Sequence, residues 1–334
     1  MLMAKPSPNS NFNSLSGVSV HDTQNPAIAR YRDLWHSRPK TCTPGSFPLH
    51  LDLEITSRCN LKCTFCDKLP VLGTDQIGDM DLKLFQHIID QGTESGLASI
   101  KLSYRGEPLL HPKIAEMVSY AKSRGILDVY FNSNGMLLTN TKAQSLIDAG
   151  LDRISISIEG TNPAAFEAAR RGARFEKIKN NVRELVRLRD ANRLAHPKVR
   201  IQTVSLPGID LDEYAEYWGP FCDETAAIDY KDCEKVPDML VHEGFACPQL
   251  WQRMTIEWNG IIHPCNNDDT GRFALGNASS QDLQSLWLSP KVQEARELHQ
   301  EGKSHMVEAC RVCPWRATQI AKLCGGNLTQ HQNM

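Results

Sequence analysis

The sequence predicts an α/β fold in which six strand–helix units form an open partial barrel, followed by a small second domain. Between His50 and Glu234, short strand-like segments alternate with longer segments of helical periodicity. This order is typical of a parallel sheet with its helices packed outside. After Glu234 the alternation stops and a group of cysteines begins. Six units are too few for a closed eight-stranded barrel, so we expect an open (β/α)6 barrel with its functional loops at the carboxyl ends of the strands.

Length and composition limit the classes of protein to which this chain can belong. A chain of 334 residues can hold one principal domain and an appendage. The formal net charge is −2 and no block of Lys and Arg covers a face, so we expect neither nucleic acid nor a membrane as partner. No apolar run has the length of a membrane span, and the N-terminus has no apolar signal core. Eleven cysteines without an export signal favour metal binding or redox chemistry in a reducing cytoplasm.

The N-terminal segment predicts an arm and a helix. Residues 1–24 are rich in Ser, Asn and Pro, which favours a disordered arm. Asn25 and Pro26 favour the start of a helix that runs to about Trp35 and stops before Pro39, as a lid on the domain behind it. The predicted division is a flexible arm with a short helix (1–47), the partial barrel (48–234), the second domain (235–322) and a tail (323–334).

The six units are read from apolar periodicity and from turn residues between the segments. Strands are expected at His50–Thr56, Ser99–Tyr104, Asp128–Asn132, Arg153–Ser157, Lys198–Val204 and Ala227–Tyr230. Helices are expected at Asp81–Ser95, Pro112–Arg124, Asn140–Ala149, Phe175–Arg189 and Leu211–Trp218.

The first strand alternates apolar and polar side chains. Its polar positions are His50, Asp52, Glu54 and Thr56, and side chains two apart share one face of a strand. A strand packed on both faces would be apolar throughout. Two readings therefore stand for His50 and Asp52, a polar lumen that holds a ligand or an edge strand with one wet face.

Three thiols follow this strand, at Cys59, Cys63 and Cys66. Thiolates are soft ligands that suit iron–sulfur clusters and zinc. Three of them on one loop can hold three irons of a 4Fe–4S cube and leave the fourth iron open, whereas the alternatives are a zinc knuckle or three unrelated buried cysteines.

With Phe65 before its last cysteine, this loop resembles the signature of the radical S-adenosylmethionine (SAM) enzymes. The resemblance implies a SAM-binding 4Fe–4S cluster on these three cysteines. It also implies reductive cleavage of SAM to a 5′-deoxyadenosyl radical, and a flavodoxin or ferredoxin as electron donor.

Other strand ends resemble further segments of that family. Arg105-Gly106-Glu107-Pro108 is similar to its Gly-Gly-Glu-Pro motif, with Arg105 in place of the first glycine. Because arginine carries a fork of donors, Arg105 either grips substrate or pairs with a neighbouring acid. The resemblance implies SAM contacts from Phe65, Gly106, Glu107, Pro108, Asn134, Ser157 and Arg171, with Arg170 competing for the role of Arg171. Substrate contacts are expected from Glu54, Tyr104 and Arg105, and Cys233 is a candidate catalytic hydrogen donor or a small packing residue.

The second domain contains Cys247, Cys265, Cys310 and Cys313. Together with Gly260 and Leu275-Gly276-Asn277, these cysteines resemble the SPASM/Twitch auxiliary-cluster domain, and their spacing is similar to that of 2-deoxy-scyllo-inosamine dehydrogenases. Four thiolates imply one auxiliary 4Fe–4S cluster without an open iron, which would transfer electrons or stabilise the fold. The alternative is a structural zinc ion. The roles of Cys42, Cys222 and Cys324 stay open.

Three enzymatic readings follow from the resemblance. The first is a radical SAM oxidoreductase that takes hydrogen from a small polar substrate, such as a sugar or aminocyclitol, and passes an electron to the auxiliary cluster. The second is a radical epimerase that uses Cys233 or Cys222 as hydrogen donor, and the third is a peptide-maturation enzyme. The ~45 residues before the first strand are too few for an independent leader-peptide domain. A non-catalytic iron–sulfur scaffold would not need Gly106, Glu107 or Ser157.

Overall fold

A ten-stranded sheet organises the chain. The computed structural model describes residues 12–21, 25–66, 77–206, 208–230, 241–268 and 271–324. Along the sheet the strands follow the order β1-β9-β8-β6-β5-β4-β2-β10-β11-β12. The six predicted strands are neighbours and run parallel, which confirms the partial barrel. They are β2 (His50–Leu53), β4 (Ser99–Lys101), β5 (Asp128–Ser133), β6 (Arg153–Ser157), β8 (Lys198–Val204) and β9 (Glu224–Ile228).

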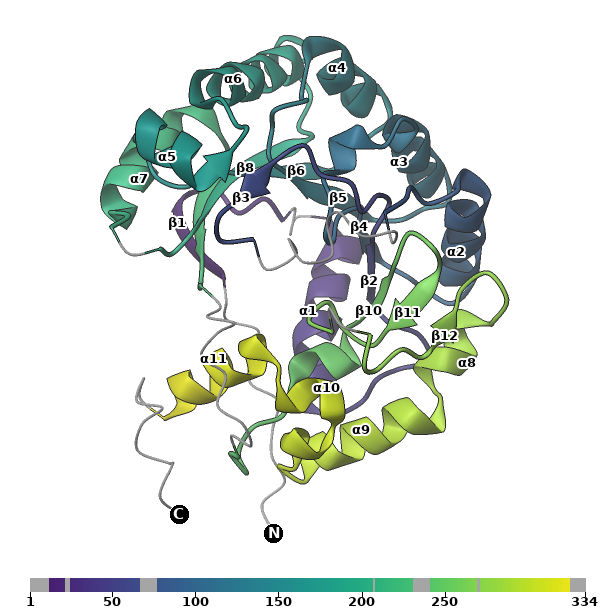
Figure 1. Cartoon of the computed structure of the whole chain (residues 1–334). Coiled ribbons are helices and arrows are strands. Elements are labelled where there is room, and N and C mark those ends of the chain that lie inside the picture. Colours follow the sequence, from purple (N-terminus) through teal and green to yellow (C-terminus); the bar gives the residue numbers. More distant parts are fainter. Residues whose placement is uncertain are drawn as a thin grey trace.

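An arc of helices covers the convex face of the sheet (Figure 1). Each helix faces the sheet with an apolar stripe, as the burial of Phe85, Ile88 and Ile89 on the first of them shows. Side chains at Asp81 and Thr139 accept backbone N–H groups and so fix two of the helix starts. The helices are α2 (Leu82–Glu94), α3 (Ile114–Ser123), α4 (Asn140–Asp148), α5 (Pro163–Ala169), α6 (Phe175–Ala191) and α7 (Leu211–Trp218).

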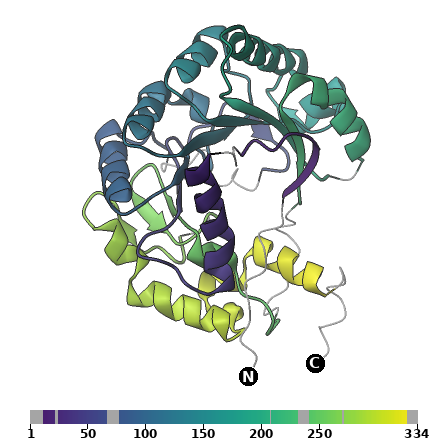
Figure 2. The same cartoon turned by 180° about the vertical axis from the view of Figure 1, so that it is seen from behind.

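The N-terminal segment differs from the expected disordered arm. Residues Phe12–Gly17 form β1, which pairs antiparallel with β9 and so covers that edge of the sheet. The low apolar content of this segment suggested disorder. An edge strand is nevertheless stabilised by backbone hydrogen bonds to its neighbour. Helix α1 (Pro26–Lys40) begins as predicted at Asn25 but includes Pro39. Figure 2 shows α1 lying across the concave side of the sheet, where it buries Tyr31 and Trp35.

The C-terminal segment continues the same sheet, which the sequence did not reveal. Strand β10 (Arg253–Ile256) pairs in parallel with β2, and β11 (Ile261–His263) and β12 (Gly276–Asn277) extend the sheet antiparallel. The second domain is thus hydrogen-bonded to the first strand of the barrel. It is completed by α8 (Leu283–Trp287), α9 (Pro290–Gln300), α10 (Glu308–Arg311) and α11 (Pro314–Leu323), which lie together below the sheet in Figure 1.

The polar positions of the first strand are buried inside the molecule. Because β2 lies between β4 and β10, the edge-strand reading of His50 and Asp52 is wrong. Asp52 is 0% exposed and forms ion pairs with Lys101 and Arg253 at 2.6 and 2.9 Å. The lumen of the barrel therefore contains charged side chains, and the Asp52 carboxylate is paired within it.

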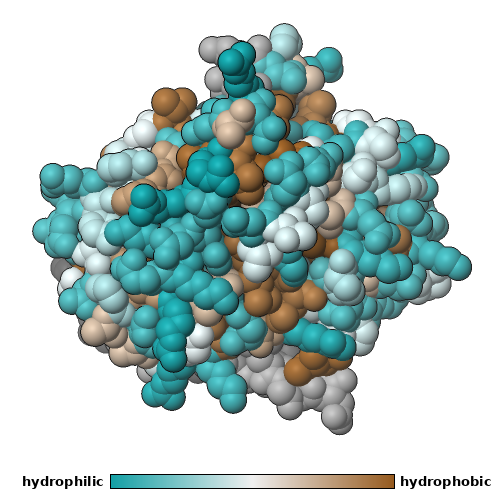
Figure 3. Space-filling model, turned by 90° about the horizontal axis from the view of Figure 1, so that it is seen from above, coloured by the Kyte–Doolittle hydropathy of each residue, from teal (hydrophilic) through white to brown (hydrophobic). Residues whose placement is uncertain are grey.

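The outer surface is mixed in character. Seen from above, brown apolar patches alternate with teal hydrophilic side chains (Figure 3). No helix among the described residues is long and apolar enough to cross a membrane.

Candidate active site

The cysteine loop lies at the carboxyl end of β2 and is held from two sides. The short strand β3 (Lys62–Cys63) pairs antiparallel with β7 (Arg170–Arg171). Next to this pair, the Thr64 N–H donates to the Ala169 carbonyl at 2.9 Å. Cys59, Cys63 and Cys66 are partly buried and form no disulfide. Three thiols on an anchored loop suit a cluster that needs three thiolate ligands.

The surroundings of these thiols favour the protonated form until a cation binds. Burial raises the pKa of Cys59, and it raises the pKa of Cys63 to about 11, with the neighbouring cysteines adding to both shifts. Metal ions deprotonate thiols on binding. Arg170 brings a fixed positive charge to the site, since its guanidinium lies 3.9 Å from the Cys63 sulfur.

Arg170, rather than Arg171, faces the cysteine loop. Its side chain is buried, forms a two-point ion pair with Glu159 and lies 5.4 Å from the Phe65 ring centre. Arg171 is exposed. The sequence could not separate these adjacent arginines, because the β3–β7 register decides which of them points inward. A role for Arg171 at SAM stays a proposal that its exposure does not support.

Gly106 allows the turn after β4 to touch the cysteine loop. A Cβ atom there would lie 2.3 Å from the Thr56 carbonyl oxygen and 2.6 Å from that of Arg58, closer than side chains are found. The next residue, Glu107, donates its N–H to the same Arg58 carbonyl at 2.7 Å. Only glycine fits this approach of two backbones.

Glu107 joins the β4 turn to the end of β5. Its carboxylate is buried and accepts hydrogen bonds from the Ser133 hydroxyl at 2.7 Å and from the Asn134 N–H at 2.7 Å. Burial raises the pKa of Glu107. The Asn134 side chain in turn donates to the Asn60 side chain at 2.9 Å, inside the cysteine loop. Glu107 and Asn134 therefore position the loop, whatever else they bind.

Two further residues that were expected to contact SAM are Pro108 and Ser157. Pro108 begins a short 3-10 helix, Pro108–Leu110, directly after Glu107. Ser157 ends β6 and is partly buried, in register with Gln202 of β8. Both lie at the carboxyl edge of the sheet, where the cysteine loop also lies.

Arg105 pairs with acids, one of the two roles expected of it. It donates to both oxygens of Glu54 at 2.6 Å, and its Nη2 lies 2.8 Å from Glu257 of the second domain. The Arg105 and Glu54 side chains are 3% and 0% exposed. The Tyr104 ring lies 5.2 Å from the Arg105 guanidinium carbon. Contacts from these groups to a substrate stay a proposal, and their charges are already compensated within the protein.

The ion pair at Arg105 belongs to a longer chain of charges. Glu257 accepts from His263 Nε2 at 3.0 Å, and His263 Nδ1 lies 3.2 Å from Asp268. Burial lowers the pKa of His263, but hydrogen bonds to Asp268 and Glu257 outweigh it and raise the pKa to about 9. His263 stands two residues before Cys265, so the chain connects the β4 turn to the second cysteine group.

The four predicted cysteines of the second domain line one pocket. Cys247 precedes the short 3-10 helix Pro248–Trp251, Cys265 follows β11, and Cys310 and Cys313 flank the end of α10. Burial and the other cysteines raise the pKa of Cys247 and Cys310 well above the usual value. The described residues contain no group of three or more His, Cys, Asp or Glu side chains that could hold a single metal ion. Four thiolates in one pocket could complete the coordination of a 4Fe–4S cluster.

A buried histidine in this pocket also suits such a cluster. The Cys247 N–H donates to His299 Nδ1 at 3.0 Å, so Nδ1 is the unprotonated ring nitrogen and Nε2 carries the proton. His299 is 0% exposed, lines the four-cysteine pocket, and its Nε2 has no hydrogen-bond partner in the described part of the structure. A buried N–H without an acceptor is costly, and a cluster sulfide would supply one.

A large polar cavity lies on the concave side of the sheet. Its volume is about 540 Å³. Its walls come from the inner face of the barrel, from α1 and the residues after β1, and from Gln249, Arg253, Asn266 and Trp315 of the second domain. Trp315 also lines the four-cysteine pocket, so the two spaces share this lining residue. The sequence could not show this cavity, because its walls come from segments more than two hundred residues apart.

The remaining described cysteines are Cys42, Cys222 and Cys324. Cys42 packs against the same apolar cluster as Cys310, and Cys324 packs against the cluster that contains Cys313. Cys233 falls in 231–240, which the structure does not describe. Cys222 precedes β9, at the end of the sheet opposite the cysteine loop, and donates to the backbone carbonyls of Trp218 and Glu224. Burial raises its pKa to about 12. Cys42 and Cys324 are partly buried.

Two family descriptions match this chain. Residues 53–217 match the radical SAM superfamily, and residues 247–314 match an iron–sulfur cluster-binding domain called SPASM. Both matches lie inside the predicted domain limits, which remain a proposal. The first match contains the three-cysteine loop and the second contains all four cysteines of the second domain.

Sequence relatives include GTP 3′,8-cyclases. A probable GTP 3′,8-cyclase of Methanococcus maripaludis is 34% identical over 141 residues, which cover 40% of this chain and 44% of that protein. The GTP 3′,8-cyclase of Chlorobaculum tepidum is 33% identical over 167 residues, covering 49% and 47%. The matched region thus spans less than half of these relatives.

Solved structures share the fold. BtrN in complex with AdoMet and 2-DOIA aligns with a TM-score of 0.55 at 18% identity, over 80% of this chain and 94% of that one. SuiB of Streptococcus suis bound to precursor peptide SuiA aligns with a TM-score of 0.58 at 16% identity, over 87% and 73%. At these identities the likeness extends to architecture and no further.

Proposed function

Because the chain belongs to the radical SAM superfamily and carries a SPASM iron–sulfur domain, we propose that it is an oxidoreductase that converts a hydroxyl-bearing carbon of a small polar molecule to a carbonyl. The cavity of about 540 Å³ carries this proposal. Its volume suits a sugar-sized molecule. Polar side chains of both domains line it, and Trp315 joins it to the four-cysteine pocket.

The bound groups supply the redox chemistry of this reaction: SAM on the first cluster supplies a hydrogen-atom acceptor, and the auxiliary cluster supplies an acceptor for one electron. Cys59, Cys63 and Cys66 would hold the first cluster, and Cys247, Cys265, Cys310 and Cys313 the second. Glu107 and Asn134 fix the first loop through hydrogen bonds to its neighbours and to Asn60. SAM contacts from Phe65, Gly106, Pro108 and Ser157 are part of the proposal.

The protein shields the cavity from water on several sides. Helix α1 crosses the concave side and places Tyr31, Arg32, Trp35 and His36 in the cavity wall. The Trp35 and Tyr31 side chains are 7% and 4% exposed. A substrate held there would contact these two buried rings on one side.

Epimerisation by this fold would need a hydrogen donor opposite SAM. Cys222 does not suit that role, because it stands at the amino end of β9 and its thiol donates to two backbone carbonyls. Cys233 remains available to that reading, and we expect it to be dispensable. Oxidation needs only an electron acceptor, and four cysteines are placed to hold one beside the cavity.

The experiment that tests this function is anaerobic and uses the reconstituted full chain. With SAM and a reductant, a panel of sugars, aminocyclitols and sugar phosphates is screened for formation of 5′-deoxyadenosine and of a ketone in equal amounts. We expect the Cys233→Ala variant to retain ketone formation. Deuterium entering the product from heavy water, with no ketone formed, would show epimerisation instead. A precursor peptide as the sole accepted substrate would favour the peptide-maturation reading.

We further propose a flavodoxin or ferredoxin as the electron donor and the cytoplasm as the location, since both clusters require a reducing compartment.

A further inference from the structure

The cavity on the concave side is lined by an excess of basic side chains. Among the described residues, the cations in its wall are Arg32, Lys101, Arg153, Arg200 and Arg253, and the one carboxylate is Glu224. Asp52 and Asp128 stand behind this wall and pair with three of the cations. The charges of the cavity can therefore be counted from its ion pairs.

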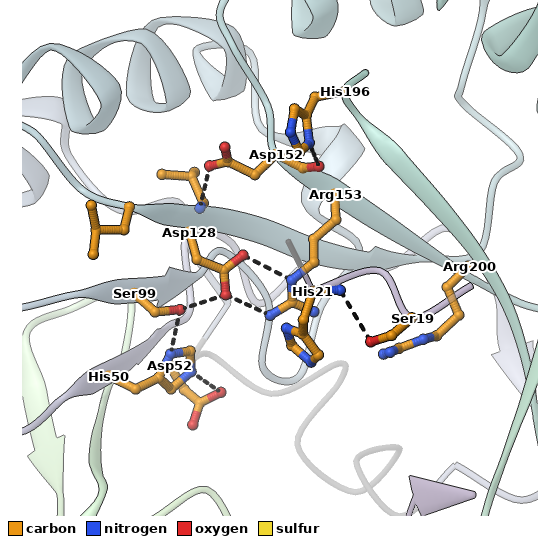
Figure 4. Close-up of polar contacts among 12 residues, drawn as sticks. Ser19, His21, His50, Asp52, Ser99, Asp128, Asp152, Arg153, His196 and Arg200 are labelled. Atoms are coloured by element: carbon orange, nitrogen blue, oxygen red, sulfur yellow. Dashed lines mark hydrogen bonds and ion pairs between the residues drawn. The ribbon is translucent and has the colours of Figure 1, made fainter. Parts of the chain in front are cut away.

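Two of the arginines are balanced one to one. Arg153 donates to both oxygens of Asp128 at 2.8 Å, as Figure 4 shows. Arg200 donates to Glu224 at 2.7 and 3.0 Å. Each pair is neutral as a unit, and neither contributes to the excess.

Asp52, in contrast, is shared between two cations. Its Oδ1 lies 2.6 Å from Lys101 and its Oδ2 lies 2.9 Å from Arg253. His50 also lies near Asp52, and burial lowers its pKa to about 4, so it adds no charge at neutral pH. One carboxylate thus faces two cations, and one positive charge is left over.

Arg32 supplies the second uncompensated charge. In the described part of the chain it forms no ion pair, and its guanidinium lies against the rings of Tyr31 and Trp35 at 5.8 and 5.7 Å. The Arg253 guanidinium lies 4.9 Å from the same Trp35 ring. The two surplus charges therefore meet at one aromatic side chain.

Two buried atoms in the wall lack partners. Arg253 Nε and Gln249 Oε1 have no hydrogen-bond partner among the described residues, and these residues are 9% and 3% exposed. A buried donor without an acceptor costs about 1–3 kcal/mol, more when it is charged. Natural proteins accept such a cost where a ligand completes the bonds.

The neighbouring histidines do not change the net charge of the cavity wall. His21 lies beside Arg153 and Arg200 in Figure 4. Burial lowers the pKa of His21, and Arg153, Arg32 and Arg200 lower it further. Burial likewise lowers the pKa of His36. Both rings are neutral near pH 7, and the ion pairs of the described residues leave the cavity wall a net charge of about +2.

We propose that the substrate of this site is an acid carrying about two negative charges, a phosphate monoester or a dicarboxylate, seated on Arg32 and Arg253 beside Trp35. This inference rests on the proposed function, in which the same cavity holds the substrate, and it narrows the substrate class. An anion would compensate the two surplus charges and accept from Arg253 Nε. A substrate amine would add a further positive charge to a buried cationic site.

Binding to the anaerobically reconstituted full chain, measured by calorimetry, tests this assignment. The probes are glucose 6-phosphate, glucarate, glucose and glucosamine. We expect at least one acidic probe to bind at least tenfold more tightly than glucose. The binding of that probe should weaken as salt is added. The better acidic probe identifies phosphate or dicarboxylate as the preferred group. Glucosamine should bind no better than glucose.

A matched pair of variants on α1 localises the effect. Arg32→Gln should weaken the acidic probe about tenfold, because one charged hydrogen-bond donor is lost. Arg30→Gln removes the same charge from an exposed position of the same helix and should leave binding unchanged. Equal losses in both variants, glucose or glucosamine binding as tightly as the acids, or no binding of either acid at millimolar concentration would overturn the assignment.

The outcome for the proposed function is read separately. Formation of 5′-deoxyadenosine from SAM and a reductant tests the radical SAM activity without any probe. Selective acid binding in a protein that cleaves no SAM would reject the function and keep the anion site. SAM cleavage without acid binding would keep the proposed function and reject the anion site.

Discussion

Arg105 Nη2 lies 2.8 Å from the Glu257 carboxylate, and this contact joins the end of β4 to the end of β10. Arg105 stands immediately before Gly106 and Glu107, which shape the cysteine loop of the barrel. Glu257 belongs to the domain of the second cysteine group and also accepts from His263. A single guanidinium therefore contacts both halves of the protein.

Replacing Arg105 should destabilise the fold. Arg105→Gln leaves the buried Glu54 carboxylate without its cation, which typically costs about 3–5 kcal/mol, while Glu257 keeps its contact with His263. Urea unfolding measures the change. As a control, Arg124→Gln breaks an ion pair with Asp90 whose side chains are 42% and 40% exposed, and should cost less than about 1 kcal/mol. Equal stability of the two variants would show that the buried contact contributes nothing.

The cysteine loop should be indispensable for SAM cleavage. Cys59→Ala, Cys63→Ala and Cys66→Ala each remove one of the three thiolates that the cluster needs. We expect 5′-deoxyadenosine formation to fall to the background level in each. Cys222→Ala, at the opposite end of the sheet, should retain it. Activity near the wild-type level in any of the three loop variants would refute the assignment.

The number of iron atoms follows from the two cysteine groups. With three cysteines in one and four in the other, two 4Fe–4S clusters give about eight irons per chain. Removing Cys59, Cys63 and Cys66 together should leave about half of the iron, still with the Mössbauer spectrum of a cubane. Zinc in place of that remaining iron would identify the second site as a structural zinc site.

His299 should tune the auxiliary cluster. Its Nε2 proton points to no acceptor among the described residues, and a hydrogen bond to a cluster sulfur favours the reduced, more negative state. His299→Leu should therefore lower the midpoint potential of that cluster in a redox titration followed by electron paramagnetic resonance. His305→Leu, in the same domain but outside the pocket lining, should leave it unchanged. An unaltered potential in both variants would exclude the hydrogen bond.

Local pattern was sufficient to predict the barrel. Alternation and turn residues placed six parallel strands in the right order, and three closely spaced cysteines marked the carboxyl end of β2. The signals were strong because each depends on neighbours in sequence. For Gly106 the sequence predicted a SAM contact, which stays a prediction, and it did not indicate the close approach of two turns that the missing Cβ allows.

The sequence did not reveal the long-range pairings between strands. Nothing in Phe12–Gly17 indicates that it pairs with β9, and nothing in Arg253–Ile256 indicates that it pairs with β2. Strands of this length have weak patterns, and tertiary contacts decide their partners. The choice of Arg170 over Arg171 depended likewise on the β3–β7 register, where a shift of one residue exchanges the two faces.

The parallel pairing of β10 with β2 restricts the relative motion of the two halves of the protein. A hinge between the two halves would have to break ladder hydrogen bonds at the centre of the sheet and separate Arg105 from Glu257. Domain opening on the microsecond-to-millisecond scale is therefore disfavoured as a route into the cavity. Substrate exchange would then proceed without separating the two halves. The two cluster sites keep a constant separation meanwhile, so the rate of electron transfer between them should not vary with the loading of the cavity.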